Sequence, residues 1–400
     1  MQKKGLLLVL GLYVLSSVAS YSAFSYMGGT VAPGGLNSGP SVDTSGDEET
    51  LLGALLTIDP SEPKDQPCPL NGQLYTQTEK TAWSAKRPLA VMIENSPDAR
   101  PQSGMGSADV VFEAIAEGGV TRFMGLFYCE VQRFDTTLAP VRSARTYFID
   151  WASGFNYPLY VHVGGANIPG PADALGQINQ YGWALENDLN QFSIGYPTFV
   201  RNGNRLNGKQ VATEHTMETS TEKLWKVATD RDWTNMSPER RLGKTIIKPT
   251  DWLEDFTPWE FQDGKASTAA VEPIKFEFWS GFAQYAIEWR YDSSTNSYMR
   301  VMGGEPHVDL NDGKQIAVTN AVVLFTTEKG PIDEAKHMLY TTTGTGKALV
   351  FQNGQTIDAR WSKKDREDEL TFTDAKGKDI TFVRGPVWIS VVDTSTEVTY

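Results

Sequence analysis

Cysteine and histidine are scarce in this chain of 400 residues, which has two cysteines, Cys68 and Cys129, and four histidines. These numbers build no disulfide framework and no four-sulfur zinc site, so we expect no metal and no cofactor. Basic residues are also fewer than acidic ones, because 36 Lys and Arg against 49 Asp and Glu give a net charge of −13. A chain of this charge has no general attraction for phosphate backbones, and we expect no nucleic-acid partner.

The remaining composition is that of a folded protein, with 21% charged and 40% hydrophobic residues and a length that suits two domains. Shifts in composition divide the chain into four parts. We expect a signal peptide or membrane anchor over 1–27, a flexible tether and lead-in over 28–79, an α/β domain over 80–240 and a smaller β-rich domain over 245–400.

The first 27 residues are typical of an export signal. Lys3 and Lys4 precede an apolar run, and no charged residue follows until after Val42. Small residues at 17–19 suit cleavage by a signal peptidase, but the uncharged stretch is also long enough to remain as a membrane helix. Both alternatives place the rest of the chain outside the cytoplasm, in the cell envelope, either anchored by this helix or secreted.

The segment after this signal is rich in Gly, Ser, Pro and Thr, which predicts a tether without a core of its own. Cys68 lies at the end of this lead-in, and Cys129 lies in an apolar run. Outside the cytoplasm the two could form a disulfide, although two unpaired thiols are equally compatible with the sequence.

The first domain alternates strand and helix patterns. We expect a buried strand at 88–94, a hairpin of 108–117 and 120–128 around Gly118-Gly119, a helix capped by Ser143, a strand at 159–163 and a helix opened by Pro171. This order predicts an α/β fold, in which ligands sit at the carboxyl ends of strands.

The second domain has several short runs that alternate between apolar and polar residues, with hairpin turns at 352–355 and 374–378. We expect an antiparallel sandwich or open barrel. Trp279, Trp289, Trp361 and Trp388 could stack on sugars, but their strand spacing favours core positions.

An anion site is predicted in the first domain. Arg142, Ser143 and Arg145 lie at an expected helix start, and Arg122 follows the diglycine turn, so guanidinium groups and free N–H groups could meet one anion. The alternative is that these arginines pair with acids such as Glu113 or Asp150. The full set of predicted ligand-binding residues is Arg100, Thr121, Arg122, Arg142, Ser143, Arg145, Gly164 and Gly165.

Acid–base chemistry has four candidates: Glu113, Glu117, His162 and His215. The two glutamates could face one side, as paired catalytic carboxylates must, and the histidines could carry protons. Each also has a structural interpretation, as a solvated or salt-bridged acid or as a core histidine. Gly164-Gly165 is a weak anion-loop signal because the lysine of nucleotide motifs is missing.

Six runs of this first domain closely resemble the YerB-like putative lipoproteins of bacteria. These runs are 87–95, 99–104, 108–113, 117–123, 140–145 and 161–165. The segment around His215 and the last strands also resemble that family. The resemblance covers the chain from Arg87 onward and implies an envelope protein with an α/β domain, a β-rich partner and no assigned function. One departure is that the first cysteine is Cys68, so no cysteine directly after the signal is present for acylation.

Three functions remain open. The first is a binding module for an anionic cell-wall component or an envelope protein. The second is an envelope enzyme that acts on a glycan or phosphodiester, with Glu113 or Glu117 and His162 or His215 beside the arginines. The third is an assembly factor without a cleft, which an exposed apolar patch on the β domain would favour.

Overall fold

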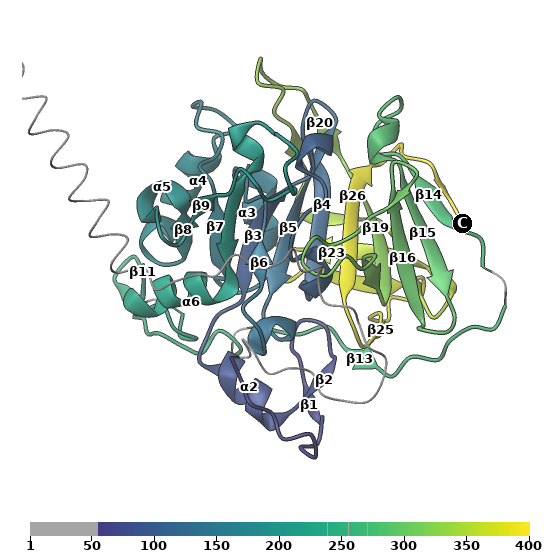
Figure 1. Ribbon diagram of the computed structural model, residues 1–400, viewed down its shortest axis with the longest axis horizontal. Helices are drawn as coiled ribbons and strands as arrows, with labels where there is room; N and C mark the ends of the chain where they lie inside the picture. Colours follow the sequence, from purple (N-terminus) through teal and green to yellow (C-terminus); the bar gives the residue numbers. More distant parts are fainter. Residues whose placement is uncertain (1–54, 238, 255, 270) are drawn as a thin grey trace, which may run out of the picture. The chain divides into compact units, whose positions relative to one another are not determined.

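The computed structural model describes residues 55–400 except 238, 255 and 270 (Figure 1). The predicted signal or anchor over 1–27 and most of the tether lie outside these residues. Within the described chain, no helix is long and apolar enough to cross a membrane.

A ten-stranded sheet runs through both predicted domains. Its order and bounds are β24 (Thr371–Asp374), β23 (Gln355–Lys363), β22 (Gly344–Gln352), β19 (Asn320–Thr326), β26 (Val387–Asp393), β4 (Val110–Glu117), β5 (Val120–Phe127), β3 (Leu89–Glu94), β7 (Leu159–His162) and β8 (Asp188–Asn190). Strand β19 is parallel to β26, and β26 is parallel to β4. On the other side β3, β7 and β8 are parallel neighbours.

A second, antiparallel sheet comes from the C-terminal half. Its strands are β17 (Glu305–Pro306), β16 (Ser297–Met302), β15 (Ile287–Asp292), β14 (Ile274–Phe276) and β27 (Val398–Thr399), with β18 (Ala317–Val318) paired to β16. Figure 1 shows β14, β15 and β16 beside β19 and β26.

The other strands form small sheets. They are β1 (Gln66–Pro67) with β2 (Leu74–Tyr75), β6 (Thr137–Leu138) and β9 (Val200–Arg201) on either side of β10 (Met217–Ser220), β11 (Arg240–Leu242) with β12 (Thr245–Ile247), β13 (Phe261–Gln262) with β25 (Phe382–Val383), and β20 (Glu328–Lys329) with β21 (Leu339–Tyr340). The α-helices of the described chain are α2 (Gln77–Ser84), α3 (Thr146–Ser153), α4 (Ala174–Gln180), α5 (Gln191–Ile194) and α6 (Thr221–Asp230).

The core lies on both faces of the large sheet, because alternate residues of a strand point to opposite sides. Phe112 of β4 stacks on Trp151 of α3. On the opposite face Trp388 of β26 packs edge-on against Trp289 of β15, so the two sheets share an aromatic layer. The core interpretation of the tryptophans is therefore confirmed for these positions and for Trp361.

Most local predictions are confirmed. The strand at β3 and the hairpin of β4 and β5 are present, and Gln352 pairs with Gln355 across the predicted turn. Two details differ. The strands β19 and β26 extend the N-terminal sheet instead of closing a sandwich or barrel, and helix α3 begins at Thr146 after Arg145, so Ser143 does not cap it.

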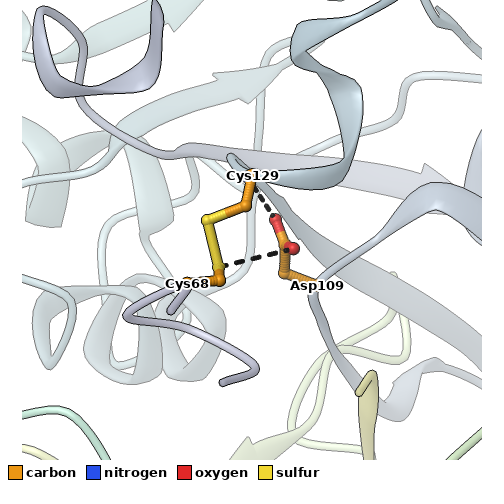
Figure 2. A group of neighbouring side chains, drawn as sticks. All are labelled: Cys68, Asp109 and Cys129. Carbon is orange, nitrogen blue, oxygen red and sulfur yellow. Dashed lines mark hydrogen bonds between the residues drawn. A yellow bond between two sulfur atoms is a disulfide. The ribbon is translucent and has the colours of Figure 1, made fainter. Parts of the chain in front are cut away.

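Cys68 and Cys129 form a disulfide, the first of the two alternatives that the sequence left open. Figure 2 shows Asp109 beside it. The Asp109 carboxyl group accepts hydrogen bonds from Asn71 Nδ2 and from the backbone N–H groups of Tyr128 and Cys129. Since the two sulfurs are bonded to each other, this group offers no pair of thiolates to a metal.

Candidate functional site

The carboxyl ends of the parallel strands meet at one edge of the large sheet. Strand β3 ends at Glu94 and strand β4 at Glu117, while the antiparallel strand β5 between them begins nearby and pairs Arg122 with both Glu94 and Ala114. Ligands of open α/β sheets bind at this edge, where strand order and loops leave an opening.

Charged side chains gather there. We name as the edge cluster the residues Glu94, Glu117, Arg122, Arg142, Arg145 and His215. Arg122 donates to Glu117 Oε1 at 2.6 Å, and Arg145 donates to Glu117 Oε2 at 2.7 Å. The two arginines are almost fully buried, whereas the Glu117 side chain keeps 27% of its exposure. Glu117 therefore lies on the solvent side of an arginine pair.

The second half of the edge cluster surrounds Glu94. Arg142 Nε lies 3.6 Å from Glu94 Oε1, and His215 Nδ1 lies 3.0 Å from Glu94 Oε2. Neither contact is an aligned hydrogen bond, since Arg142 Nε, Glu94 Oε2 and His215 Nδ1 all lack one. Arg142 is 27% exposed and is thus the arginine of the edge cluster that solvent reaches.

The charged side chains of the edge cluster do not sum to zero. Three arginines face two glutamates, which leaves one excess positive charge within a chain of net −13. Burial alone would raise the pKa of Glu117, but Arg122 and Arg145 overcome it and lower that pKa to about 2. Glu117 thus remains ionised at neutral pH and neutralises part of the arginine charge.

Glu113, predicted as a partner of Glu117, is placed elsewhere. It is fully buried and accepts hydrogen bonds from Arg300 Nη2 at 2.6 Å, from the Thr121 hydroxyl and from Trp388 Nε1. A β-bulge between Ile115 and Glu117 interrupts the strand alternation, so the two carboxylates contact different arginines.

His162 also stays outside the edge cluster. Its ring lies fully buried between Asp188 Oδ1, 2.5 Å from Nε2, and the Gly164 carbonyl, 2.6 Å from Nδ1. Gly164 has a φ of 57° and donates its N–H to Asn190, so this N–H is already used within the protein. Gly165 pairs with Ala144 and helps to hold the segment that carries Arg142 and Arg145.

The other predicted residues have internal partners. The Ser143 carbonyl accepts from Arg122 Nη1, and the Thr121 hydroxyl bonds to Glu113 and Asn95. Arg100 donates to Asn95 and to the Gln284 carbonyl rather than to an acid. Arg142 and Arg145 both lie beside acids, as the ion-pair alternative expected, but these acids are Glu94 and Glu117 instead of Asp150 or Glu113.

Two residues of this region were missed by the sequence reasoning. Glu94 ends the predicted strand at 88–94, and a charged residue that closes an apolar strand is a signal that could have indicated a site at this edge. Tyr285 comes from the C-terminal half, in the 3₁₀ turn Ala283–Tyr285, and the Arg100 guanidinium lies 4.9 Å from its ring centroid. Nothing in the local sequence of Tyr285 indicates this position.

One hollow in the described part of the chain is lined by none of these residues. It has a volume of about 1060 Å³ and runs along β14 and the end of β26, where Trp279 donates to Glu328 at 2.5 Å. The most exposed large apolar side chains, Leu185, Phe192 and Tyr196, belong to the N-terminal half and not to the β domain.

These features define an α/β protein in which two sequence segments share one sheet and a charged cluster lies at its carboxyl edge. Comparison with known proteins assigns each of these two segments to a domain of one protein family. Residues 74–234 match the N-terminal domain and residues 275–389 the C-terminal domain of "Protein of unknown function (DUF3048)". The chain belongs to this family.

Two relatives support the assignment. The chain is 28% identical over 340 residues to "Putative lipoprotein YerB" of Bacillus subtilis (strain 168), covering 83% of this chain and 88% of the relative. It also resembles the crystal structure of the YerB protein from Bacillus subtilis, with a TM-score of 0.65, 26% identity, and coverage of 84% of this chain and all of that one. The resemblance noted from the sequence is therefore confirmed.

Proposed function

We propose that this protein is an extracytoplasmic envelope protein that binds an anionic ligand at the edge cluster. The N-terminal export pattern and the name of its relative, a putative lipoprotein, support the location. In this proposal the first 27 residues tether the folded part to the membrane or are removed after export.

The observation that carries the proposal is the arrangement around Arg142. This arginine is partly exposed and has no aligned hydrogen bond from Nε. Like the buried Arg122 and Arg145, it lowers the pKa of Glu117 through its charge. Each arginine contact to an anion that is shielded from water contributes about 1.5–3 kcal/mol. Loss of the Arg142 contact would therefore weaken binding by roughly tenfold or more.

Retention of cell-wall material tests the proposal. The full chain is immobilised and exposed to purified bacterial cell-wall fragments, before and after chemical removal of their phosphate groups. We expect retention of the anionic fragments, and at least tenfold less retention by Arg142→Ala. The control is Arg290→Ala, which removes an exposed arginine of β15. Equal retention by the two variants would exclude the edge cluster as the binding site.

The contact of His215 with Glu94 favours a second candidate function. A carboxylate and a histidine beside an arginine can move a proton while the arginine stabilises negative charge, as an envelope enzyme acting on a glycan or phosphodiester requires. The same fragments, followed by chromatography over time, test this candidate. Release of smaller products by the wild-type chain but not by Glu94→Gln would support the enzyme, whereas bound and unchanged fragments would favour the binding module.

A further inference from the structure

Buried polar atoms without an aligned hydrogen bond occur in the residues that contact or electrostatically influence Glu94 and Glu117. Such atoms belong to the guanidinium Nε of Arg122, Arg142 and Arg145, Oε2 of Glu94, Nδ1 of His215 and the hydroxyl of Tyr285. Leaving a buried polar group unpaired costs about 1–3 kcal/mol, so several at one place need an explanation. A ligand that supplies partners to them would provide it.

Tyr285 brings the C-terminal half of the chain to this place. Arg100 links it to Glu94, because the guanidinium lies over the Tyr285 ring, donates to the neighbouring Gln284 carbonyl, and also donates to Asn95 directly after Glu94. Tyr285 is 1% exposed. Burial raises its pKa to about 12, against the charge of Arg100, which lowers it, and with a further increase from the charges of Glu94 and Glu117. The hydroxyl therefore stays protonated and can donate to a ligand oxygen.

Glu94 limits the kind of anion that fits. A carboxylate repels a bare anion, but it accepts a hydrogen bond from a hydroxyl group. The Arg142 contact with Glu94 is a 3.6 Å approach without an aligned hydrogen bond, and Arg142 is the partly exposed partner. Movement of the Arg142 side chain towards a ligand anion would free one Glu94 oxygen for a ligand hydroxyl.

We infer that the edge cluster selects a hydroxylated anion, such as a polyol phosphate, whose anionic group contacts Arg142 while a neighbouring hydroxyl donates to Glu94 and the Tyr285 hydroxyl donates to a ligand oxygen. This inference rests on the proposed function and makes it more specific. The ligand thereby contacts both family segments, through Arg142 and Glu94 in the first and Tyr285 in the second. The same chemistry occurs in soluble polyol phosphates and in lipid headgroups.

Calorimetric titration of the full chain with three small probes tests the inference. Glycerol 3-phosphate should bind at least tenfold more tightly than inorganic phosphate, and glycerol should not bind. Glu94→Gln should reduce the tenfold preference to less than threefold, because phosphate binding improves when the repelling charge is gone. Tyr285→Phe should weaken glycerol 3-phosphate binding about 3- to 10-fold. The matched control is Tyr291→Phe, which removes a half-buried hydroxyl of β15 that donates to Asn296. This variant should bind glycerol 3-phosphate with the affinity of the wild-type chain.

The outcomes separate this inference from the proposed function. Equal affinity for phosphate and glycerol 3-phosphate, with both lost in Arg142→Ala, would overturn the selectivity and leave the anion site. No binding of any anionic probe would overturn both. A comparison of phosphatidylglycerol vesicles with phosphatidylcholine vesicles shows whether the ligand is a lipid headgroup or a soluble polyol phosphate. The inference would also be contradicted if phosphatidylglycerol vesicles bind, soluble glycerol 3-phosphate does not displace them, and Tyr285→Phe binds them as tightly as the wild-type chain. Near-ultraviolet circular dichroism confirms that each variant is folded.

Discussion

Arg300→Met should destabilise the protein strongly, because it leaves a buried carboxylate without its cation. Arg300 of β16 donates from Nη2 to Glu113 Oε2 of β4 at 2.6 Å, and both side chains are fully buried. The pair joins the two sheets across the shared aromatic layer, where the Arg300 guanidinium lies 4.2 Å from the Trp388 ring centroid.

The magnitude follows from the burial of the pair. Removing one partner of a buried ion pair costs about 3–5 kcal/mol, since the remaining charge has lost its compensation in a medium that solvates it poorly. Glu113 would keep the hydrogen bonds from Thr121 and Trp388, which places the expected loss near the lower end of that range. An exposed ion pair is worth about 0–1 kcal/mol, so Arg290→Ala on the neighbouring strand β15 is the control.

Urea unfolding followed by tryptophan fluorescence measures this difference. We expect the free energy of unfolding to fall by about 3 kcal/mol in Arg300→Met and by less than about 1 kcal/mol in Arg290→Ala. The double variant Glu113→Leu with Arg300→Met should lose less than the sum of the two single variants, because it leaves no unpaired charge. Additive losses, or a loss in Arg300→Met no larger than in Arg290→Ala, would show that the variant leaves no costly unpaired charge.

Three further predictions concern stability. Replacing both Cys68 and Cys129 by serine should lower the free energy of unfolding in urea titrations by roughly 4 kcal/mol, because the disulfide closes a loop of 61 residues, and a loss below about 1 kcal/mol would contradict this. Burial raises the pKa of Asp109 to about 7, so between pH 4 and pH 7 the folded state keeps a proton that the unfolded state releases. The contribution of Asp109 to the free energy of unfolding should therefore fall by about 2–3 kcal/mol from pH 5 to pH 8. Thermal melts of Asp109→Asn should lack this fall. Arg87 donates to the carbonyls of Thr234, Tyr157 and Glu186. Arg87→Met should therefore lower the free energy of unfolding in urea titrations by at least about 2 kcal/mol. An unchanged urea midpoint would contradict this prediction.

Local patterns in the sequence predict the elements but not how they are joined. The diglycine at 118–119 and the turn at 352–355 define hairpins because turn residues and strand alternation act within about ten residues. The parallel pairing of β26 with β4 joins Trp388 to Val111 across most of the chain. No local pattern encodes that neighbour, so the sequence predicts a separate antiparallel sandwich or barrel where the structure has one sheet that runs through both segments.

The candidate site shows the same division. Arg122, Arg142, Arg145, Glu117 and His215 were all proposed from their motifs, and folding brings them to one edge of the sheet. Their partners depend on tertiary contacts, so Glu94 and Tyr285 were not anticipated. Glu113 and His162 were proposed for the same site, but the bulge in β4 and the contact of the buried His162 ring with Asp188 place them elsewhere.

The dependence of anion binding on Arg142 decides whether the edge cluster is a binding site. The full chain, Arg142→Ala and Arg290→Ala are each titrated calorimetrically with glycerol 3-phosphate at low and at physiological ionic strength. We expect saturable binding by the wild-type chain and by Arg290→Ala that weakens with salt, and at least tenfold weaker binding by Arg142→Ala at both ionic strengths. Identical isotherms for all three proteins would show that Arg142 does not bind the anion.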